Sequence, residues 1–223
     1  MTIKLFIQAI SKFILGIVLV GVLVFLPAGT ISFVNGWIFM AILFIPMFIA
    51  GLVMMAKNPV LLERRLDAKD KQNDQSIVIK LSGLMFLAGF IVAGLNYRFA
   101  WHILPMGVSI GAAVVFLIAY LLYAEVLREN TYLSRTIEVQ ENQKVIDTGL
   151  YGIVRHPMYS VTLLLFLAMP LVLGSLISLV IFLAYPFIIA ARIKGEEKFL
   201  TEELAGYDEY KEKVKYRLIP FIW

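Results

Sequence analysis

The chain has 223 residues, of which 61% are hydrophobic and only 16% are charged, and its formal net charge is +4. Soluble domains carry about 25% charged residues, so the composition excludes an ordinary soluble domain and gives no reason to expect a nucleic-acid partner. The absence of cysteine excludes disulfides, thiolate metal sites and cysteine nucleophiles. Several uncharged apolar runs reach the length of about 20 residues that a helix needs to cross a bilayer. The sequence therefore predicts an integral membrane protein.

The first half of the chain predicts four membrane-spanning helices. The apolar runs that predict them lie at residues 5–26, 36–56, 78–96 and 102–124. No clean small-x-small cleavage pattern follows the first run, so we interpret it as a retained helix and not as a cleaved signal. Residues 57–80 form a long polar loop between the second and third spans. We treat residues 1–124 as an N-terminal transmembrane region and residues 125–223 as a second region.

The second half contains a run without any charged residue, from 157 to 191. This run of 35 residues is longer than one helix needs to cross a hydrocarbon core of about 30 Å. Gly174 and Ser175 divide the run in two. We therefore expect a tight helical hairpin with arms at 158–173 and 176–192. A charged, tyrosine-rich tail follows it.

Lysine and arginine concentrate in the two long polar loops, 57–80 and 125–156, whereas the short loops at 27–35 and 97–101 hold none and one. The positive-inside rule then puts both long loops and both termini in the cytoplasm. The expected fold is all-α and integral to the membrane. It has five to six transmembrane helices, depending on whether the short hairpin arms cross fully. A cytoplasmic pocket would be built from the loop before the hairpin and the tail.

Two polar segments border the start of the hairpin. The first is VQENQKVIDTGLY, residues 139–151, a β-prone stretch in which Gly149 is suited to a tight turn. The second is Arg155-His156-Pro157. Proline suits the first turn of a helix, so His156 is expected at a helix N-terminus, beside free backbone N–H groups.

A third polar segment follows the hairpin and holds Arg192 and Glu196, which are four residues apart and share one helix face. Because the two ends of a hairpin emerge on the same side of the membrane, we expect these residues to meet His156 and Tyr159 in one pocket at the membrane surface. Such a pocket suits a reaction between a soluble, charged cosubstrate and a lipid-embedded one. Simpler interpretations stay open: Arg155-His156 is an interfacial anchor, and EEKFLTEEL is the solvated face of a helix.

Taken together, GLYGIVRHPMYS, the uncharged hairpin and the later pattern R…EE..L…Y..Y…V…R.IP resemble the isoprenylcysteine carboxyl methyltransferase and phospholipid methyltransferase superfamily. The resemblance covers about residues 125–223, and it implies that this second region is the catalytic methyltransferase region. It implies an integral membrane methyltransferase with S-adenosylmethionine as methyl donor and S-adenosylhomocysteine as product. The donor would be bound without a Rossmann domain, in a cytoplasmic pocket wrapped by the catalytic loop and the tail.

The same resemblance implies roles for individual residues. Arg192 and Glu196 match the catalytic positions at the reacting end, and no metal ligands are expected. Aromatic faces such as those of Tyr151 and Tyr159 can attract the donor's sulfonium cation, and helix N–H groups near His156 can bind its carboxylate. The implied donor-binding residues are Gln140, Gln143, Lys144, Val145, Ile146, Gly149, Tyr151, His156, Tyr159 and Glu197.

The resemblance implies a lipophilic or prenylated acceptor in the membrane, foremost the carboxylate of an isoprenylcysteine-like substrate. A carboxylate needs no general base, and Arg192 could hold it while Glu196 fixes the guanidinium. A phospholipid amine or another small acceptor would have to lose a proton, with Glu196 or His156 as the base. The sequence does not decide between these acceptors, nor does it predict an oligomeric state. An NADPH-dependent membrane reductase and a non-enzymatic membrane scaffold also stay open.

Overall fold

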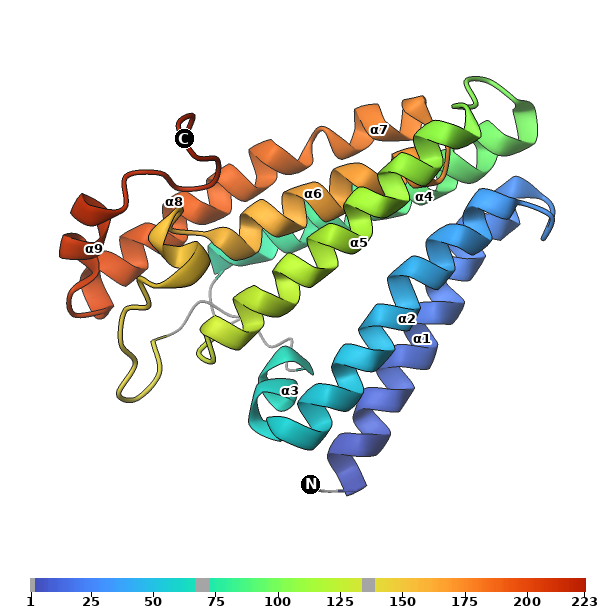
Figure 1. The fold of residues 1–223 in the computed structure, drawn as a ribbon. Helices are drawn as coiled ribbons and strands as arrows, with labels where there is room; N and C mark the ends of the chain where they lie inside the picture. The colour runs from blue at the N-terminus through green and yellow to red at the C-terminus, as the bar shows by residue number, and fades with distance from the viewer. Residues whose placement is uncertain (1–2, 67–72, 134–138) are drawn as a thin grey trace.

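The structure is a computed structural model, and it describes residues 3–66, 73–133 and 139–223 (Figure 1). Within these ranges the chain forms helices and no strand, which confirms the predicted all-α class. The helices are α1 (Ile3–Ala28), α2 (Val34–Lys57), α3 (Pro59–Leu66), α4 (Asn73–Phe99), α5 (Met106–Glu129), the short 3-10 helix η1 (Gly149–Gly152), α6 (Pro157–Val172), α7 (Leu176–Phe182), α8 (Tyr185–Glu203) and α9 (Tyr207–Lys213).

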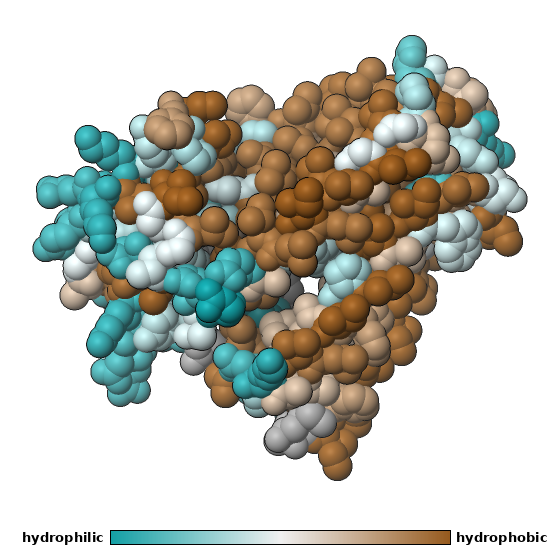
Figure 2. All heavy atoms as spheres, viewed as in Figure 1, coloured by the Kyte–Doolittle hydropathy of each residue, from teal (hydrophilic) through white to brown (hydrophobic). Residues whose placement is uncertain are grey.

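Among the residues that the structure describes, five helical stretches are long and apolar enough to cross a membrane. They are Ile3–Ala28, Val34–Lys57, Ile77–Phe99, Met106–Glu129 and Leu176–Glu203. The sixth apolar helix, α6, has only 16 residues. Figure 2 shows hydrophobic residues covering the long helices and polar residues gathered at the end of the molecule that carries α9. Apolar side chains that face outward in this way suit a hydrocarbon surrounding and not water.

The polar loop predicted between the second and third spans is partly helical. It contains α3, and α4 begins at Asn73, before the apolar part of that helix. Residues 67–72 of this loop lie outside the described residues. The side chain of Asn58 accepts a hydrogen bond from the backbone N–H of Leu61 at 3.1 Å, which stabilises the start of α3 against the end of α2.

The hairpin is formed, but its second arm differs from the prediction. Gly174 makes the turn with φ +73°, and Ser175 caps α7 by accepting a hydrogen bond from the backbone N–H of Ser178 at 3.1 Å. The arm then breaks between α7 and α8, because Pro186 has no N–H to continue the helical bonding. α8 runs on to Glu203, past the predicted end of the arm at residue 192, and Arg192 and Glu196 lie on one helix as expected.

Aromatic packing holds the hairpin against the earlier helices. The ring of Phe182 on α7 lies 5.5 Å from that of Phe86 and 6.0 Å from that of Phe90, both on α4. α5 lies along α6 over most of its length (Figure 1). As a result, the end of α5, the start of α6 and the last turns of α8 meet at the polar end of the molecule.

The close approach of α1 and α4 depends on Gly94. A Cβ atom at this position would lie 2.6 Å from the carbonyl oxygen of Val24 and 2.9 Å from the Cβ of Pro27. Small residues let membrane helices pack at short distance. We expect Gly94→Ala to lower the free energy of unfolding in detergent by about 1–3 kcal/mol, because the backbone of α1 cannot move aside locally. In Gly83→Ala, the matched control on α4, the new Cβ meets nothing within 4 Å. An equal loss in both variants would contradict this account of the packing.

Candidate functional site

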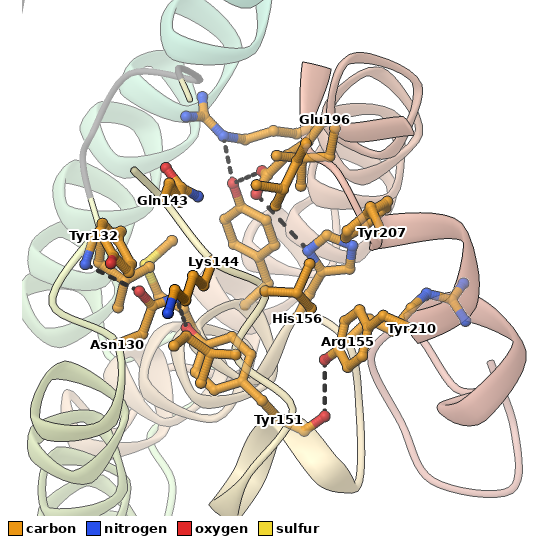
Figure 3. Close-up of a pocket in the computed structure, with 18 residues that line it drawn as sticks. Asn130, Tyr132, Gln143, Lys144, Tyr151, Arg155, His156, Glu196, Tyr207 and Tyr210 are labelled. Carbon is orange, nitrogen blue, oxygen red and sulfur yellow. Dashed lines mark hydrogen bonds and ion pairs between the residues drawn. The ribbon is translucent and has the colours of Figure 1, made fainter. Parts of the chain in front are cut away.

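A pocket lies at the polar end, where α5, α6, α8 and α9 meet the loop before the hairpin (Figure 3). The space between its walls, with the open solvent at its mouth included, is about 840 Å³. Most of the residues predicted for the site line it. These are Gln143, Lys144, Val145, Ile146, Tyr151, His156, Tyr159, Arg192 and Glu196.

The other predicted residues lie beside the pocket. Gln140 donates a hydrogen bond from its side-chain amide to the carbonyl oxygen of Tyr132 at 2.7 Å, and it lines a neighbouring hollow. Gly149 opens η1 with φ +54°, which confirms the predicted turn, and a Cβ there would lie 3.2 Å from the carboxyl carbon of Glu129. Glu197 lies behind His156 and is described below.

The segment before η1, which was predicted to be β-prone and to contain a turn, forms no strand. Residues 139–148 are irregular, with a turn at which Asn142 takes φ +58°. The side chain of Gln143 folds back to accept a hydrogen bond from the backbone N–H of Gln140 at 2.9 Å. A strand needs a partner for its backbone groups, and the described residues offer none here. The segment instead lines the pocket.

At one end of the pocket, α6 and α8 are joined by a chain of three side chains. Arg192 donates from Nε to the hydroxyl oxygen of Tyr159 at 2.8 Å, and Tyr159 donates to Oε2 of Glu196 at 2.5 Å. His156 is the N-cap residue of α6 and stacks on the ring of Tyr159, with centroids 5.7 Å apart. Its Nδ1 lies 3.9 Å from Oε1 of Glu196. The two ends of the hairpin therefore bring these four side chains together.

Behind this end, Glu197 ties three basic residues together. Its Oε1 accepts from Nε of Arg155 at 2.7 Å and lies 3.3 Å from Nε2 of His156, and its Oε2 accepts from Nε of Arg217 at 2.7 Å. Glu197, Arg155 and His156 are each no more than 7% exposed. The interpretation of Arg155-His156 as an interfacial anchor is therefore wrong, and Glu197 does not belong to a solvated face. Charges buried this deeply need such partners to offset their lost hydration.

The C-terminal tail is fastened across the start of α6. Arg155 donates from Nη1 to the carbonyl oxygens of Val214 at 2.6 Å and Lys215 at 2.9 Å. The backbone N–H groups of Arg155 and His156 donate to the carbonyl oxygens of Tyr216 and Arg217, each at 2.9 Å. The tail is thus bound to the same two residues that lie at the edge of the pocket, and its folding is coupled to the shape of the pocket.

Sequence reasoning missed the pocket residues on α9 and the end of α8, namely Tyr207, Tyr210, Leu200 and Leu204. Tyr210 donates a hydrogen bond to the carbonyl oxygen of Tyr151 at 2.7 Å and so joins α9 to η1. Burial raises the pKa of the Tyr151, Tyr207 and Tyr210 hydroxyls, which keeps all three neutral. The sequence did hold a signal for two of these residues. Leu200 and Leu204 continue the four-residue spacing of Arg192 and Glu196, and this spacing predicts that they lie on the same side of the helix as the pocket.

Residues 106–205 match the model of the phospholipid methyltransferase family. The matched part runs from α5 through the pocket loop and the hairpin to the end of α8. The match confirms the resemblance seen in the sequence, which is to the superfamily of integral membrane methyltransferases that includes this family. The family indicates a membrane methyltransferase that acts on a lipid substrate. No curated protein matches the chain.

Proposed function

We propose that this protein transfers a methyl group from S-adenosylmethionine to a lipophilic acceptor, foremost the carboxylate of an isoprenylcysteine-like lipid. The observation that carries the proposal is the connected set of Arg192, Tyr159 and Glu196 at one end of a pocket in the matched family region. The hydroxyl of Tyr159 bonds both the guanidinium of Arg192 and the carboxylate of Glu196. The pocket opens at the polar end of a helix bundle whose sides are hydrophobic (Figure 2).

The pocket residues fit the proposed donor. Tyr151, Tyr159, Tyr207 and Tyr210 supply aromatic rings that suit a planar base and a sulfonium cation. Glu196 adds a negative charge at the reacting end. The residues that would hold the donor are those of the 143–146 segment, together with His156 and the four tyrosines. S-adenosylmethionine supplies an electrophilic methyl group: the acceptor's lone pair bonds to the methyl carbon while the carbon–sulfur bond breaks and leaves its electron pair on sulfur.

The protein's part in such a displacement is mainly alignment, because the attacking atom, the methyl carbon and the sulfur must lie in line. Arg192 would hold an acceptor carboxylate by charge-assisted hydrogen bonds. Tyr159 fixes the position of Arg192, since it bonds Arg192 and Glu196 at once. Glu197 holds His156 from behind. A carboxylate acceptor requires no proton transfer, so none of these groups has to act as a base.

A phospholipid amine is the second candidate acceptor. It is favoured by the position of Glu196, whose side chain is 22% exposed, whereas that of Glu197 is only 8% exposed. A carboxylate that is partly open to the pocket can take the proton that an ammonium group must lose before it attacks. In this case Glu196 is the base, and Arg192 is a neighbouring residue on the same helix. By the positive-inside rule, either acceptor would be methylated on the cytoplasmic side of the membrane.

Titration calorimetry of the detergent-purified protein with S-adenosylhomocysteine tests the donor assignment. We expect binding in the micromolar range and a loss of about tenfold or more in affinity for His156→Ala, equivalent to about 1.4 kcal/mol. The matched control is His102→Ala, because His102 lies in the loop between α4 and α5, at the other end of the helices (Figure 1). The affinity of His102→Ala for S-adenosylhomocysteine should equal that of the wild type.

A well-folded wild type that binds no S-adenosylhomocysteine, in detergent and in nanodiscs, would overturn the proposal. If the protein binds NADPH and not S-adenosylhomocysteine, it is a reductase. If it binds neither compound, the non-enzymatic scaffold is the interpretation that stays open. If donor binding is found, incubation with radiolabelled donor and lipid acceptors separates the two acceptor classes. A product label that is released by mild base indicates a methyl ester, and a base-stable label indicates an N-methyl group.

A further inference from the structure

The hydroxyl of Tyr207 is the one buried side-chain polar atom without a hydrogen-bond partner among the residues that the structure describes. The residue is 4% exposed and lines the pocket (Figure 3). The other tyrosine hydroxyls of the pocket wall that lie on α6, η1 and α9 are bonded: Tyr159 to Glu196, Tyr151 to Asn130 and Tyr210 to Tyr151. Native proteins pair nearly all such groups, so an unpaired hydroxyl on a residue of the pocket wall points to a ligand.

The position of this hydroxyl is fixed by the surrounding structure. Tyr207 is the first residue of α9 and follows Gly206, which turns the chain with φ +84°. Its ring lies 5.8 Å from that of Tyr210, and Nζ of Lys211 lies 5.9 Å from its ring centroid. α9 begins beyond the residues that match the family model, 106–205. The family match therefore assigns nothing to Tyr207.

The surroundings limit the group that this hydroxyl can bind. Burial, with the charges of Glu197 and then Glu196, raises the pKa of Tyr207, so the phenol stays protonated and can donate. The same two carboxylates disfavour an anionic partner here. Tyr207 packs in a small apolar cluster with Leu204, Tyr210, Val145 and Leu200. A flat, uncharged group that accepts a hydrogen bond fits these conditions.

We propose that Tyr207 donates a hydrogen bond to a ring nitrogen of the donor's adenine, and that α9 with the end of α8 forms the adenine subsite. This inference rests on the proposed function and deepens it. It also orients the donor, with the base at Leu204 and Tyr207 and the methyl group at Arg192 and Glu196. Glu196 lies on α8 and Leu204 is the C-cap residue of that helix. Eight residues separate them, about 12 Å along a helix, a length that a nucleoside with an amino-acid arm can span.

The test is Tyr207→Phe, which removes only the hydroxyl. We expect the dissociation constant of S-adenosylhomocysteine to rise about 5- to 30-fold, as for the loss of one buried hydrogen bond. The unfolding temperature of the ligand-free protein should stay the same or rise, because the variant removes an unpaired polar group. The matched control is Tyr210→Phe, whose hydroxyl is bonded in the free protein. Its ligand-free unfolding temperature should fall.

Two further probes locate the contact. Adenosine should lose the same factor in Tyr207→Phe as S-adenosylhomocysteine does. S-adenosylhomocysteine analogues in which one ring nitrogen is replaced by CH should include one that binds the wild type more weakly but binds Tyr207→Phe with the affinity of the parent compound. A loss confined to S-adenosylhomocysteine and absent for adenosine would overturn the adenine assignment.

The two proposals fail in different ways. Wild-type protein that binds S-adenosylhomocysteine, together with Tyr207→Phe that binds it equally well, would overturn the adenine subsite and leave the proposed function standing. Folded wild-type protein that does not bind S-adenosylhomocysteine at all would overturn the proposed function, and the adenine subsite with it.

Discussion

Replacing Glu197 with alanine is expected to lower the free energy of unfolding by about 3–5 kcal/mol, the usual cost of removing one partner of a buried ion pair. Glu197 bonds Arg155 and Arg217, and it lies against His156. The side chain of Arg155 is only 6% exposed, so without this carboxylate its charge would stay buried and uncompensated. Chemical or thermal unfolding in detergent measures the change.

The same substitution should also release the tail, because Arg155 holds the carbonyl oxygens of Val214 and Lys215. Limited proteolysis should cleave Glu197→Ala near its C-terminus faster than the wild type. The control is Glu203→Ala, an exposed glutamate at the end of the same helix, which should change stability by no more than about 0.5 kcal/mol. Equal stability of Glu197→Ala and Glu203→Ala would show that the buried cluster contributes nothing to folding.

Removing the guanidinium of Arg192 should reduce methyl transfer about 100-fold while S-adenosylhomocysteine still binds. This expectation rests on the proposed function. A misplacement of about 1 Å at a reacting centre costs a factor of that size, and Arg192 shares the hydroxyl of Tyr159 with Glu196. Initial rates of Arg192→Ala with radiolabelled donor, alongside calorimetry, measure the two effects separately.

Lys194→Ala is the matched control, because Lys194 is an exposed basic residue on the same helix and should keep full activity. The pair Arg192→Ala and Glu196→Gln also separates the acceptors. A carboxylate acceptor makes Arg192→Ala the more damaging change, whereas an amine acceptor makes Glu196→Gln the more damaging one because it removes the base. Full activity of Arg192→Ala would exclude Arg192 from the reaction.

The hairpin and its site show how far sequence reasoning reached. The uncharged run predicted two antiparallel arms, and their shared side of the membrane predicted that His156 and Tyr159 would meet Arg192 and Glu196. The structure shows these contacts. Such reasoning succeeds because hydropathy and helical spacing are local properties that one segment carries by itself.

Other parts of the site could not be predicted. Gln140 and Gly149 were assigned to the donor site, but they lie beside the pocket. The β-prone segment around them, residues 139–151, forms no strand, because β propensity needs a neighbouring strand to act on. The hydrogen bonds of Arg155 to the tail were missed for a similar reason, because their partners lie about 60 residues further along the chain.

By itself, the sequence determined the membrane class of this protein, the approximate spans, the hairpin and the residues at its two ends, because each of these follows from the hydropathy or spacing of a single segment. Only the tertiary structure decided that Glu197 is buried among basic residues, that the tail is bound across the start of α6, and that Tyr207 and Tyr210 line the pocket. These features depend on α9 and the tail folding back over distant residues, and the free energy of such contacts comes from burial and pairing that no single segment encodes.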